Sequence, residues 1–335
     1  MRTVDEKMQK CCLKHEIRRA LWERYAVAAL GSRRPMKYLT LYSPAMMDIK
    51  YFERQGLIRL ADGKYLGVAA VTNDDEAYAA AIEGGVGRPQ FLAPADLNDL
   101  LVRPLKYPKY SAPFRGMFPF DVMNLDYCNS LFCSGNQNEI SLHVSALNKA
   151  IALQQQSGAK RFALLLTTRA DPGLVAEHFL DDLADRIDSN LSRNAVFRRR
   201  YESLYTRIDG ASLLAKQYDE FMPLGLVKFV GNLISSHGFE LRDCEAAYLI
   251  RGQEPRERWI LHTAFSVALP KSTLKSLGRP EYLERNVVRY LDRRMNGTMI
   301  RLAERADSKR LEAQHAKTVA ELAAIGFELH IPEPE

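Results

Sequence analysis

One stretch near the middle of the chain, residues 161–168, limits the possible folds more than any other. From Phe162 to Leu166 every position is apolar, so both faces of a strand formed here must be covered. A strand buried on both faces is typical of the centre of a parallel sheet, and parallel strands are joined by crossover helices. The stretch therefore predicts an α/β fold with helices on both sides of a mostly parallel sheet.

The rest of the chain alternates between strand and helix patterns around this stretch. Two long strand-like runs near the C-terminus, 239–250 and 259–269, are joined by a polar link and predict a β-hairpin, which we expect to be the only antiparallel feature. We predict a Rossmann-like, mostly parallel sheet with a C-terminal antiparallel hairpin, flanked by N- and C-terminal helices. The strands expected before the hairpin are 38–42, 65–71, 90–93, 121–125 and 161–168, and the Pro- and Tyr-rich stretch 104–119 is expected to be a loop.

The pattern predicts three segments. Residues 1–36 form an N-terminal helical segment, with a helix from about residue 5 that ends at Gly31. Residues 37–270 form the α/β domain. Residues 271–335 form a charge-rich helical extension, which is the candidate surface for binding a partner protein.

Composition excludes several classes of protein. The chain has 335 residues, 47% of them hydrophobic, and a formal net charge of +6, which is a mild excess compatible with a polyanionic partner. No apolar run reaches the roughly 20 residues of a membrane span, and no signal-peptide pattern is present, so we expect a cytoplasmic protein without a membrane partner. The five cysteines lack the spacing of a disulfide framework or a zinc site, and no metal is expected.

A short predicted strand, 121–125, ends in the polar and aromatic residues Asp126, Tyr127, Cys128 and Asn129. In an open α/β sheet, ligands bind in the crevice outside the carboxyl ends of the strands, so these residues are candidates for a site. The alternative is an ordinary strand followed by a polar turn. We take Asp126, Tyr127 and Asn129 as the candidate catalytic residues.

Five strand-helix steps, a long helix and a terminal hairpin resemble the class I S-adenosylmethionine-dependent methyltransferases from about residue 38 to residue 269. The sequence Asn124-Leu125-Asp126-Tyr127 resembles the strand-end motif with which amino-methylating nucleic-acid enzymes orient a base nitrogen, although no proline follows the acid here. The turn Pro94-Ala95-Asp96-Leu97 resembles the family's acidic turn near the adenine amino group.

The resemblance implies S-adenosylmethionine as the cofactor and assigns the residues that would hold it. The first strand and its turn would face the methionine part, and here that turn has no glycine. The acid that holds the ribose would fall near residue 72, although Asp74 is also suited to be a helix N-cap. The implied cofactor-binding residues are Tyr42, Ser43, Pro44, Asp48, Thr72, Asn73, Asp74 and Asp96.

The mechanism implied by the resemblance is in-line methyl transfer, in which the enzyme holds nucleophile and methyl about 3 to 3.5 Å apart. Asp126 would orient an amine, and Tyr127 would stack on a base. Cys128 is not expected to be a nucleophile, because no flanking cation would lower the pKa of its thiol. Because glycine permits close approach of backbone to a ligand, the glycine-free turn supports an alternative: a catalytically degenerate methyltransferase fold that acts as a scaffold.

A separate basic and aromatic segment, 193–216, contains Arg198, Arg199 and Arg200 next to Tyr201. Such a mixture can grip a phosphate backbone and stack on bases, so these arginines are the candidate nucleic-acid-binding residues. The alternative is the polar face of an ordinary helix.

Two further enzyme classes find little support. No G-x-G-x-x-G sequence follows the first strand, which disfavours a nicotinamide-dependent oxidoreductase. No G-x-S-x-G nucleophile elbow accompanies histidines such as His143 and His262, which disfavours a triad hydrolase.

Overall fold

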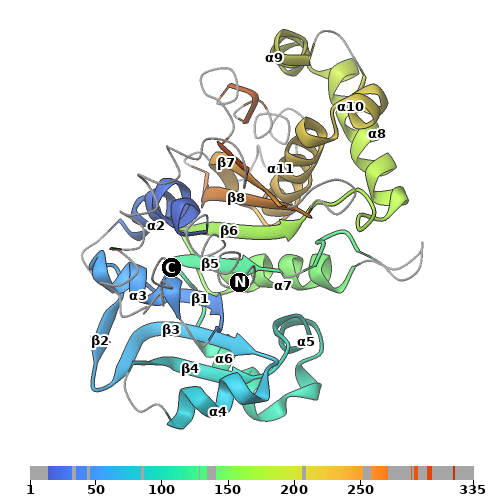
Figure 1. The fold of residues 1–335 in the computed structure, drawn as a ribbon. Helices are drawn as coiled ribbons and strands as arrows, with labels where there is room; N and C mark the ends of the chain where they lie inside the picture. The colour runs from blue at the N-terminus through green and yellow to red at the C-terminus, as the bar shows by residue number, and fades with distance from the viewer. Residues whose placement is uncertain are drawn as a thin grey trace, which may run out of the picture.

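The computed structural model describes residues 14–31, 35–43, 46–83, 87–127, 129–133, 141–205, 209–251, 258–270, 288, 290–292, 300–303 and 320. Within these ranges the chain is an α/β protein whose helices flank a single mixed sheet (Figure 1). The predicted fold class is confirmed.

Nine strands of the described chain form the sheet. They are β1 (Tyr38–Leu41), β2 (Arg59–Ala61), β3 (Lys64–Thr72), β4 (Arg88–Pro94), β5 (Val122–Asp126), β6 (Arg161–Arg169), β7 (Glu240–Arg251), β8 (Arg258–Ala268) and β9 (Ile300–Ala303). The spatial order runs β3-β1-β5-β6-β8-β7-β9, and both β4 and β2 pair with β3. Strands β4, β3, β1, β5 and β6 are mutually parallel, whereas β8 runs antiparallel to β6 and to β7. The predicted hairpin therefore belongs to the same sheet as the parallel strands.

The described helices precede, connect and follow these strands. They are η1 (Arg18–Trp22, a π-helical turn), α2 (Glu23–Leu30), α3 (Met47–Arg54), α4 (Asp75–Glu83), α5 (Leu97–Val102), η2 (Pro104–Lys106), α6 (Pro108–Gly116), α7 (Leu142–Gln156), α8 (Glu177–Arg193), α9 (Ala195–Tyr205), α10 (Gly210–Lys216) and α11 (Tyr218–Ser236). The N-terminal helix ends as expected at Gly31, whose φ of 60° suits glycine.

Two apolar cores lie on opposite faces of the sheet because successive side chains of a strand alternate. On one face Leu165 packs with residues of η1, α2 and α3, and we call this the N-helix face. On the other face Leu164 packs with residues of α5, α7, α8 and α11, and we call this the α7 face. Both neighbours in β6 are fully buried, as the continuous apolar run predicts.

The prediction of a loop over residues 104–119 is wrong in part. It contains η2 and α6, each of which begins with a proline, Pro104 and Pro108. Proline is well tolerated at the first position of a helix, where its missing N–H has no intrahelical partner. The aromatic residue Phe114 of α6 is fully buried, so this helix is part of the α7-face core.

The hairpin β7–β8 is not the only antiparallel feature, which corrects the sequence prediction. Strand β2 pairs with the start of β3 through a two-residue turn, Asp62-Gly63. Both turn residues have positive φ, 51° and 70°, as a type I′ hairpin turn requires. Asp-Gly is a strong signal for this turn, so the hairpin was readable from the sequence.

The turn after β1 reaches helix α3 through a residue with a left-handed backbone conformation. Helix α3 begins at Met47, and its N-cap is Met46, which adopts a left-handed conformation with φ of 45°. No side chain caps the helix, and Ser43 is exposed. A non-glycine residue at positive φ costs roughly 1 to 2 kcal/mol, so the turn is held in this shape by its surroundings.

Candidate functional site

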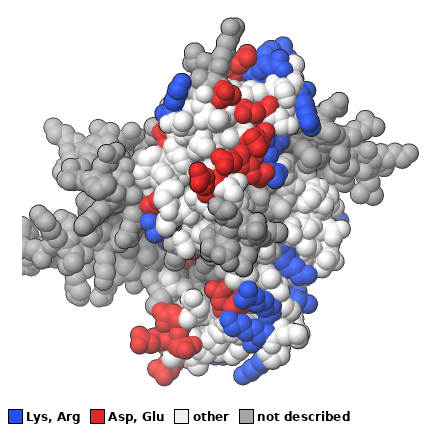
Figure 2. Space-filling model, turned by 90° about the vertical axis from the view of Figure 1, so that its right-hand side faces the viewer, with Lys and Arg blue, Asp and Glu red and all other residues white. Residues whose placement is uncertain are grey.

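The carboxyl ends of the parallel strands meet at one edge of the sheet, and the sequence-predicted site residues lie along it. The arrowheads of β5 and β6 point to this edge in Figure 1. Figure 2 views the molecule from that side and shows acidic side chains gathered at about the height of α8, with basic ones above and below. Two polar clusters flank the edge, one on each face of the sheet.

Asp126 lies on the N-helix face, where its carboxylate accepts a hydrogen bond from Lys14 Nζ and forms an ion pair with it. The Asp126 side chain is 27% exposed. Burial by itself raises the pKa of this carboxyl group, but the charges of Lys14, His262 and Arg18 outweigh it and leave the pKa below its ordinary value. Asp126 is therefore an ionised hydrogen-bond acceptor and not a proton donor.

Two more polar side chains, on β6 and β8, lie beside Asp126 on the same face of the sheet. Asp126 is in register with Thr167 of β6, and Thr167 with His262 of β8. Thr167 Oγ1 lies 2.9 Å from His262 Nδ1, and both residues are buried. The ring of Trp22 in η1 meets the His262 ring edge-on, with 6.1 Å between centroids. We call Lys14, Arg18, Asp126, Thr167 and His262 the Asp126 cluster.

The π-helical turn η1 presents buried N–H donors to this cluster. Arg18 is 6% exposed, and its guanidinium carbon lies 5.9 Å from the centre of the Trp22 ring. Among the described residues, Arg18 Nε, Arg18 Nη1 and Trp22 Nε1 have no hydrogen-bond partner. Buried donors of this kind call for an acceptor such as water or a bound ligand, and π-helical turns are frequent at functional sites.

Asp48, predicted to bind the cofactor, points from the first turn of α3 back to the sheet. Its Oδ2 accepts hydrogen bonds from Tyr38 Oη at 2.7 Å, from Thr40 Oγ1 at 2.8 Å and from Asn124 Nδ2 at 3.3 Å. Burial and the nearby Asp48 carboxylate raise the pKa of the Tyr38 hydroxyl. The contacts tie α3 to β1 and β5, so in this conformation Asp48 has a structural role.

Tyr127 follows Asp126 directly and lies on the opposite, α7 face. It is 4% exposed, and its ring centre is 4.6 Å from that of His143 in α7. Burial and the charge of Asp96 raise the pKa of its hydroxyl, so Tyr127 remains a neutral phenol. Its Oη has no hydrogen-bond partner among the described residues.

His143 and Cys133 complete the polar group on this face. Cys133 Sγ lies 3.6 Å from His143 Nδ1. Burial lowers the pKa of His143, although the charge of Asp96 opposes it, and burial raises the pKa of the Cys133 thiol. Both groups are therefore neutral near pH 7, and the pair is not an activated thiolate. We call Asp96, Tyr127, Cys133 and His143 the Tyr127 cluster.

Two of the predicted cofactor residues at the ends of β3 and β4 cap helices, and a third accepts a hydrogen bond in the turn before α4. Asp96 Oδ1 accepts from the backbone N–H groups of Asn98 and Asp99 at 2.8 and 3.1 Å, which caps α5. Asp74 Oδ1 accepts from the N–H of Ala77 at 3.0 Å and caps α4, as the alternative interpretation predicted. Thr72 Oγ1 accepts from the N–H of Asp74 at 3.1 Å.

The other predicted residues at this edge are more exposed or lie outside the described chain. Asn73 is exposed, Tyr42 is half-buried with a raised hydroxyl pKa caused by burial, and Pro44 lies outside the described residues. Asn129 is exposed, and its Oδ1 accepts from the N–H of Ser130 at 2.9 Å. The candidate catalytic residues therefore do not converge: Asp126 and Tyr127 face opposite sides of the sheet, and Asn129 shapes a turn.

Two of the three arginines proposed to bind nucleic acid make contacts within the protein. Arg198 donates to the carbonyls of Leu191 and Ser192 at 2.6 and 3.1 Å, at the end of α8. Arg200 pairs with Asp292 at 2.6 Å. Both arginines and Arg199 are exposed on α9.

The site contains residues that the sequence pattern alone did not single out. Lys14, Arg18, Thr167 and His262 were not among the candidates. The register of the sheet sets Asp126 opposite Thr167, but the continuous apolar run of β6 has no alternation that would single out Thr167 in the sequence. Lys14 lies 112 residues before Asp126, so its place in the cluster requires the fold.

The sequence was compared with models of protein families and with curated proteins. A family model described as PP_RS20740-like matches residues 111–231, a little over a third of the chain. The matched segment runs from α6 to α11 and includes β5 and β6. No curated protein matches the sequence.

Neither a candidate metal centre nor a membrane-spanning helix is present in the described chain. In the ranges given above, no three His, Cys, Asp or Glu side chains are grouped so that they could hold a metal ion. None of the helices in those ranges combines the length and the apolar character that crossing a bilayer requires.

Proposed function

We propose that this protein is an S-adenosylmethionine-dependent methyltransferase that acts at the carboxyl edge of its sheet, with nucleic acid as the proposed acceptor. The observation that carries the proposal is the strand arrangement: five parallel strands and a hairpin in the same sheet, with β8 reversed between β6 and β7. This is the layout on which the sequence resemblance rests. The fold alone hosts many functions, so the site must be tested separately.

The residues on the α7 face partly fit an adenosyl group. Three buried oxygens have no hydrogen-bond partner among the described residues: Asn98 Oδ1, Tyr127 Oη and Ser141 Oγ. They belong to the first turn of α5, the end of β5 and the N-cap of α7, and they offer both donors and acceptors. With Asp96 they are the residues we propose to hold the base, and the cofactor when bound would supply an electrophilic methyl group.

The positions proposed for the rest of the cofactor fit less well. Asp74 caps α4 and Thr72 accepts a hydrogen bond from the N–H of Asp74, so Asn73 is the exposed polar side chain left at the end of β3. The left-handed Met46 keeps the turn after β1 in a conformation that usually requires glycine. Binding through this turn would rely on the backbone around Tyr42 and Ser43.

On the acceptor side, Asp126 would orient an amino group. Its ionised carboxylate can accept a hydrogen bond from an amine, a role that Lys14 Nζ occupies in the structure. An acceptor amine would therefore have to displace Lys14, which is 34% exposed and belongs to an N-terminal helix. Cationic residues at the edge, with Arg198, Arg199 and Arg200 on α9, would attract a polyanionic acceptor.

Calorimetric titration of the purified full-length chain with S-adenosylmethionine tests the proposal. The proposal predicts measurable heat and a dissociation constant in the micromolar range, with weaker binding to the Asp96→Asn variant. The Asp126→Asn variant serves as the matched control, because Asp126 lies on the other face and should leave cofactor binding unchanged. Absence of heat with a folded wild-type protein would contradict the proposal.

The second candidate is a catalytically degenerate methyltransferase fold that serves as a scaffold or as a nucleic-acid-binding subunit. The Lys14–Asp126 ion pair and the hydrogen bonds that Thr72 and Asp74 accept favour it, since these groups already have partners within the protein. A scaffold would give no heat with S-adenosylmethionine. If it binds nucleic acid through α9, reversing the charges of Arg198, Arg199 and Arg200 would weaken binding and flatten its salt dependence.

A further inference from the structure

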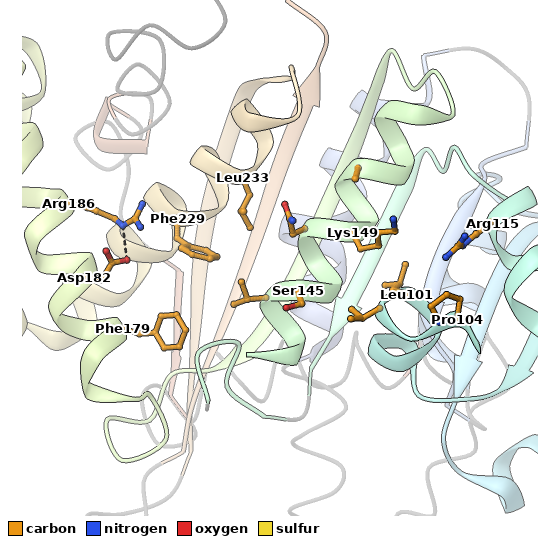
Figure 3. A pocket seen from close by; sticks show the side chains of 14 residues that line it. Leu101, Pro104, Arg115, Ser145, Lys149, Phe179, Asp182, Arg186, Phe229 and Leu233 are labelled. Carbon is orange, nitrogen blue, oxygen red and sulfur yellow. Dashed lines mark hydrogen bonds and ion pairs between the residues drawn. The ribbon is translucent and has the colours of Figure 1, made fainter. Parts of the chain in front are cut away.

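A cavity lies among the helices that cover the α7 face of the sheet. Its volume is about 770 Å³, within the range of small-molecule sites. The helices α5, α6, α7, α8 and α11 and the turn η2 contribute its lining (Figure 3). We call this cavity the α7 groove.

The floor of the groove is one stripe of α7. Ser145, Asn148, Lys149 and Ala152 line it at spacings of three, four and seven residues, which places them on one side of the helix. Ser145 and Ala152 are small, so the floor stays low between the walls. Figure 3 shows this stripe in the centre, with α8 and α11 on one side and the α5–α6 region on the other.

One wall is aromatic and aliphatic. Phe179 of α8 and Phe229 of α11 both pack against the fully buried Phe132, with ring centroids 5.3 and 5.1 Å away. Phe132 thus fixes the position of both rings from below. Leu233 extends the apolar wall along α11.

Two cations lie on the side away from the aromatic wall, Arg115 on the opposite wall and Lys149 on the floor. Arg115 of α6 and Lys149 of α7 line the groove, and Figure 3 shows their nitrogen-bearing ends pointing toward one another. Neither has an ion-pair partner among the described residues. By contrast, the lining pair Arg186 and Asp182 on α8 neutralise each other at 2.7 Å.

From these features we propose that the α7 groove binds an amphipathic organic anion, whose apolar body lies between Phe179, Phe229 and Leu233 and whose carboxylate or similar oxyanion pairs with Arg115 and Lys149. Apolar walls with a few convergent polar groups are typical of ligand pockets. A carboxylate is the natural complement of two adjacent cations that have no acidic partner. The segment matched by the family model, 111–231, contains both cations and both phenylalanines.

The groove is separate from the carboxyl-edge site but shares a helix with it. His143, in the first turn of α7, contacts Tyr127, whereas Ser145 two residues later lines the groove. The proposal does not depend on S-adenosylmethionine binding. Its failure and that of the proposed function can therefore be told apart.

Fluorescence titration with 8-anilinonaphthalene-1-sulfonate, followed by competition with decanoate, tests the proposal. We expect saturable binding of the dye to the folded full-length chain and its displacement by decanoate, with decanol at least about tenfold weaker than decanoate. The double variant Arg115→Gln/Lys149→Gln should lose about tenfold in decanoate affinity or more. The variant Lys160→Gln, which changes an exposed lysine outside the groove, should match the wild type.

A variant that fills the groove separates this site from any other apolar surface. Ala152→Phe adds a ring to the floor of the groove and should abolish dye displacement by decanoate while thermal unfolding stays cooperative. Absence of saturable dye binding by the wild type would overturn the proposal. Decanoate binding that is unchanged in Ala152→Phe, or equal binding of decanol and decanoate, would overturn it as well.

Discussion

The two clusters at the carboxyl edge of the sheet contrast in charge although they meet at adjacent residues. On the N-helix face, Asp126 is ionised and stands among the cations Lys14 and Arg18. On the α7 face, burial holds Tyr127, His143 and Cys133 neutral. Successive side chains of a strand point to opposite faces of the sheet, so Asp126 and Tyr127 lie in different electrostatic environments. Neighbouring residues of a strand-end motif therefore need not belong to the same site.

Among the substitutions that compare the two faces, we expect the largest loss of stability from replacing Asp48. Its carboxylate accepts the hydrogen bonds that hold together the polar network of the N-helix face. Replacing Asp48 with alanine leaves Tyr38, Thr40 and Asn124 without their shared acceptor, so we expect a loss of about 3 kcal/mol in the free energy of unfolding. Urea denaturation followed by circular dichroism measures it. Asp48→Asn keeps one acceptor oxygen and should lose less; equal losses would show that charge, and not hydrogen bonding, is what matters.

The next largest loss of stability is expected from breaking the ion pair between Lys14 and Asp126 on the same face. Asp126→Asn removes the carboxylate that balances Lys14 and Arg18, and we expect about 1 to 2 kcal/mol of destabilisation at neutral pH. The matched control is Glu245→Gln, which removes another ion pair between the N-terminal helix and the sheet, with Arg24, a residue whose side chain is 50% exposed. The control should cost less, and a larger loss in the control would contradict the role given to Asp126.

The lowered pKa of Asp126 predicts how the stability of the protein changes with pH. Because the pKa of Asp126 is lower in the folded state than in the unfolded state, its contribution to stability is present above the unfolded pKa and is lost as pH falls through the folded pKa. The wild type should therefore lose more stability than Asp126→Asn when urea denaturation is repeated at acidic pH. Parallel pH profiles for the two proteins would mean that the folded-state pKa is not lowered.

The smallest effect is expected on the α7 face. Tyr127 Oη is buried without a hydrogen-bond partner among the described residues, so Tyr127→Phe removes an unsatisfied group and keeps the ring against His143. We expect a change within about 1 kcal/mol, neutral or stabilising, in the same denaturation assay. A loss well above this would show that the hydroxyl has a partner and that the two faces are less different than described.

Much of the fold could be predicted from the sequence because its signals are local. The doubly apolar strand β6, the hairpin β7–β8 and the glycine that ends α2 each follow from residue patterns within one element. Helix α6 was missed because its prolines were read as loop formers, although proline also starts helices. The hairpin at Asp62-Gly63 was missed although its turn signal was present.

The candidate site could be predicted only in part. Asp126 was correctly placed at a strand end, and Asp74 was recognised as a candidate cap. The ion pair with Lys14 and the approach of Arg18 join segments more than 100 residues apart, and no local pattern encodes such a contact. The burial of Tyr127 likewise depends on α7, whose position is set by the packing of the whole α7 face.

The central claim is that the α7-face side of the carboxyl edge holds the base of S-adenosylmethionine. Ultraviolet cross-linking of methyl-labelled S-adenosylmethionine to the full-length protein, followed by peptide mapping, tests where the ligand lies. We predict label in the peptide that contains Tyr127, removed by excess unlabelled cofactor. Label confined to peptides of the α7 groove, or no label that competitor removes, would contradict the claim.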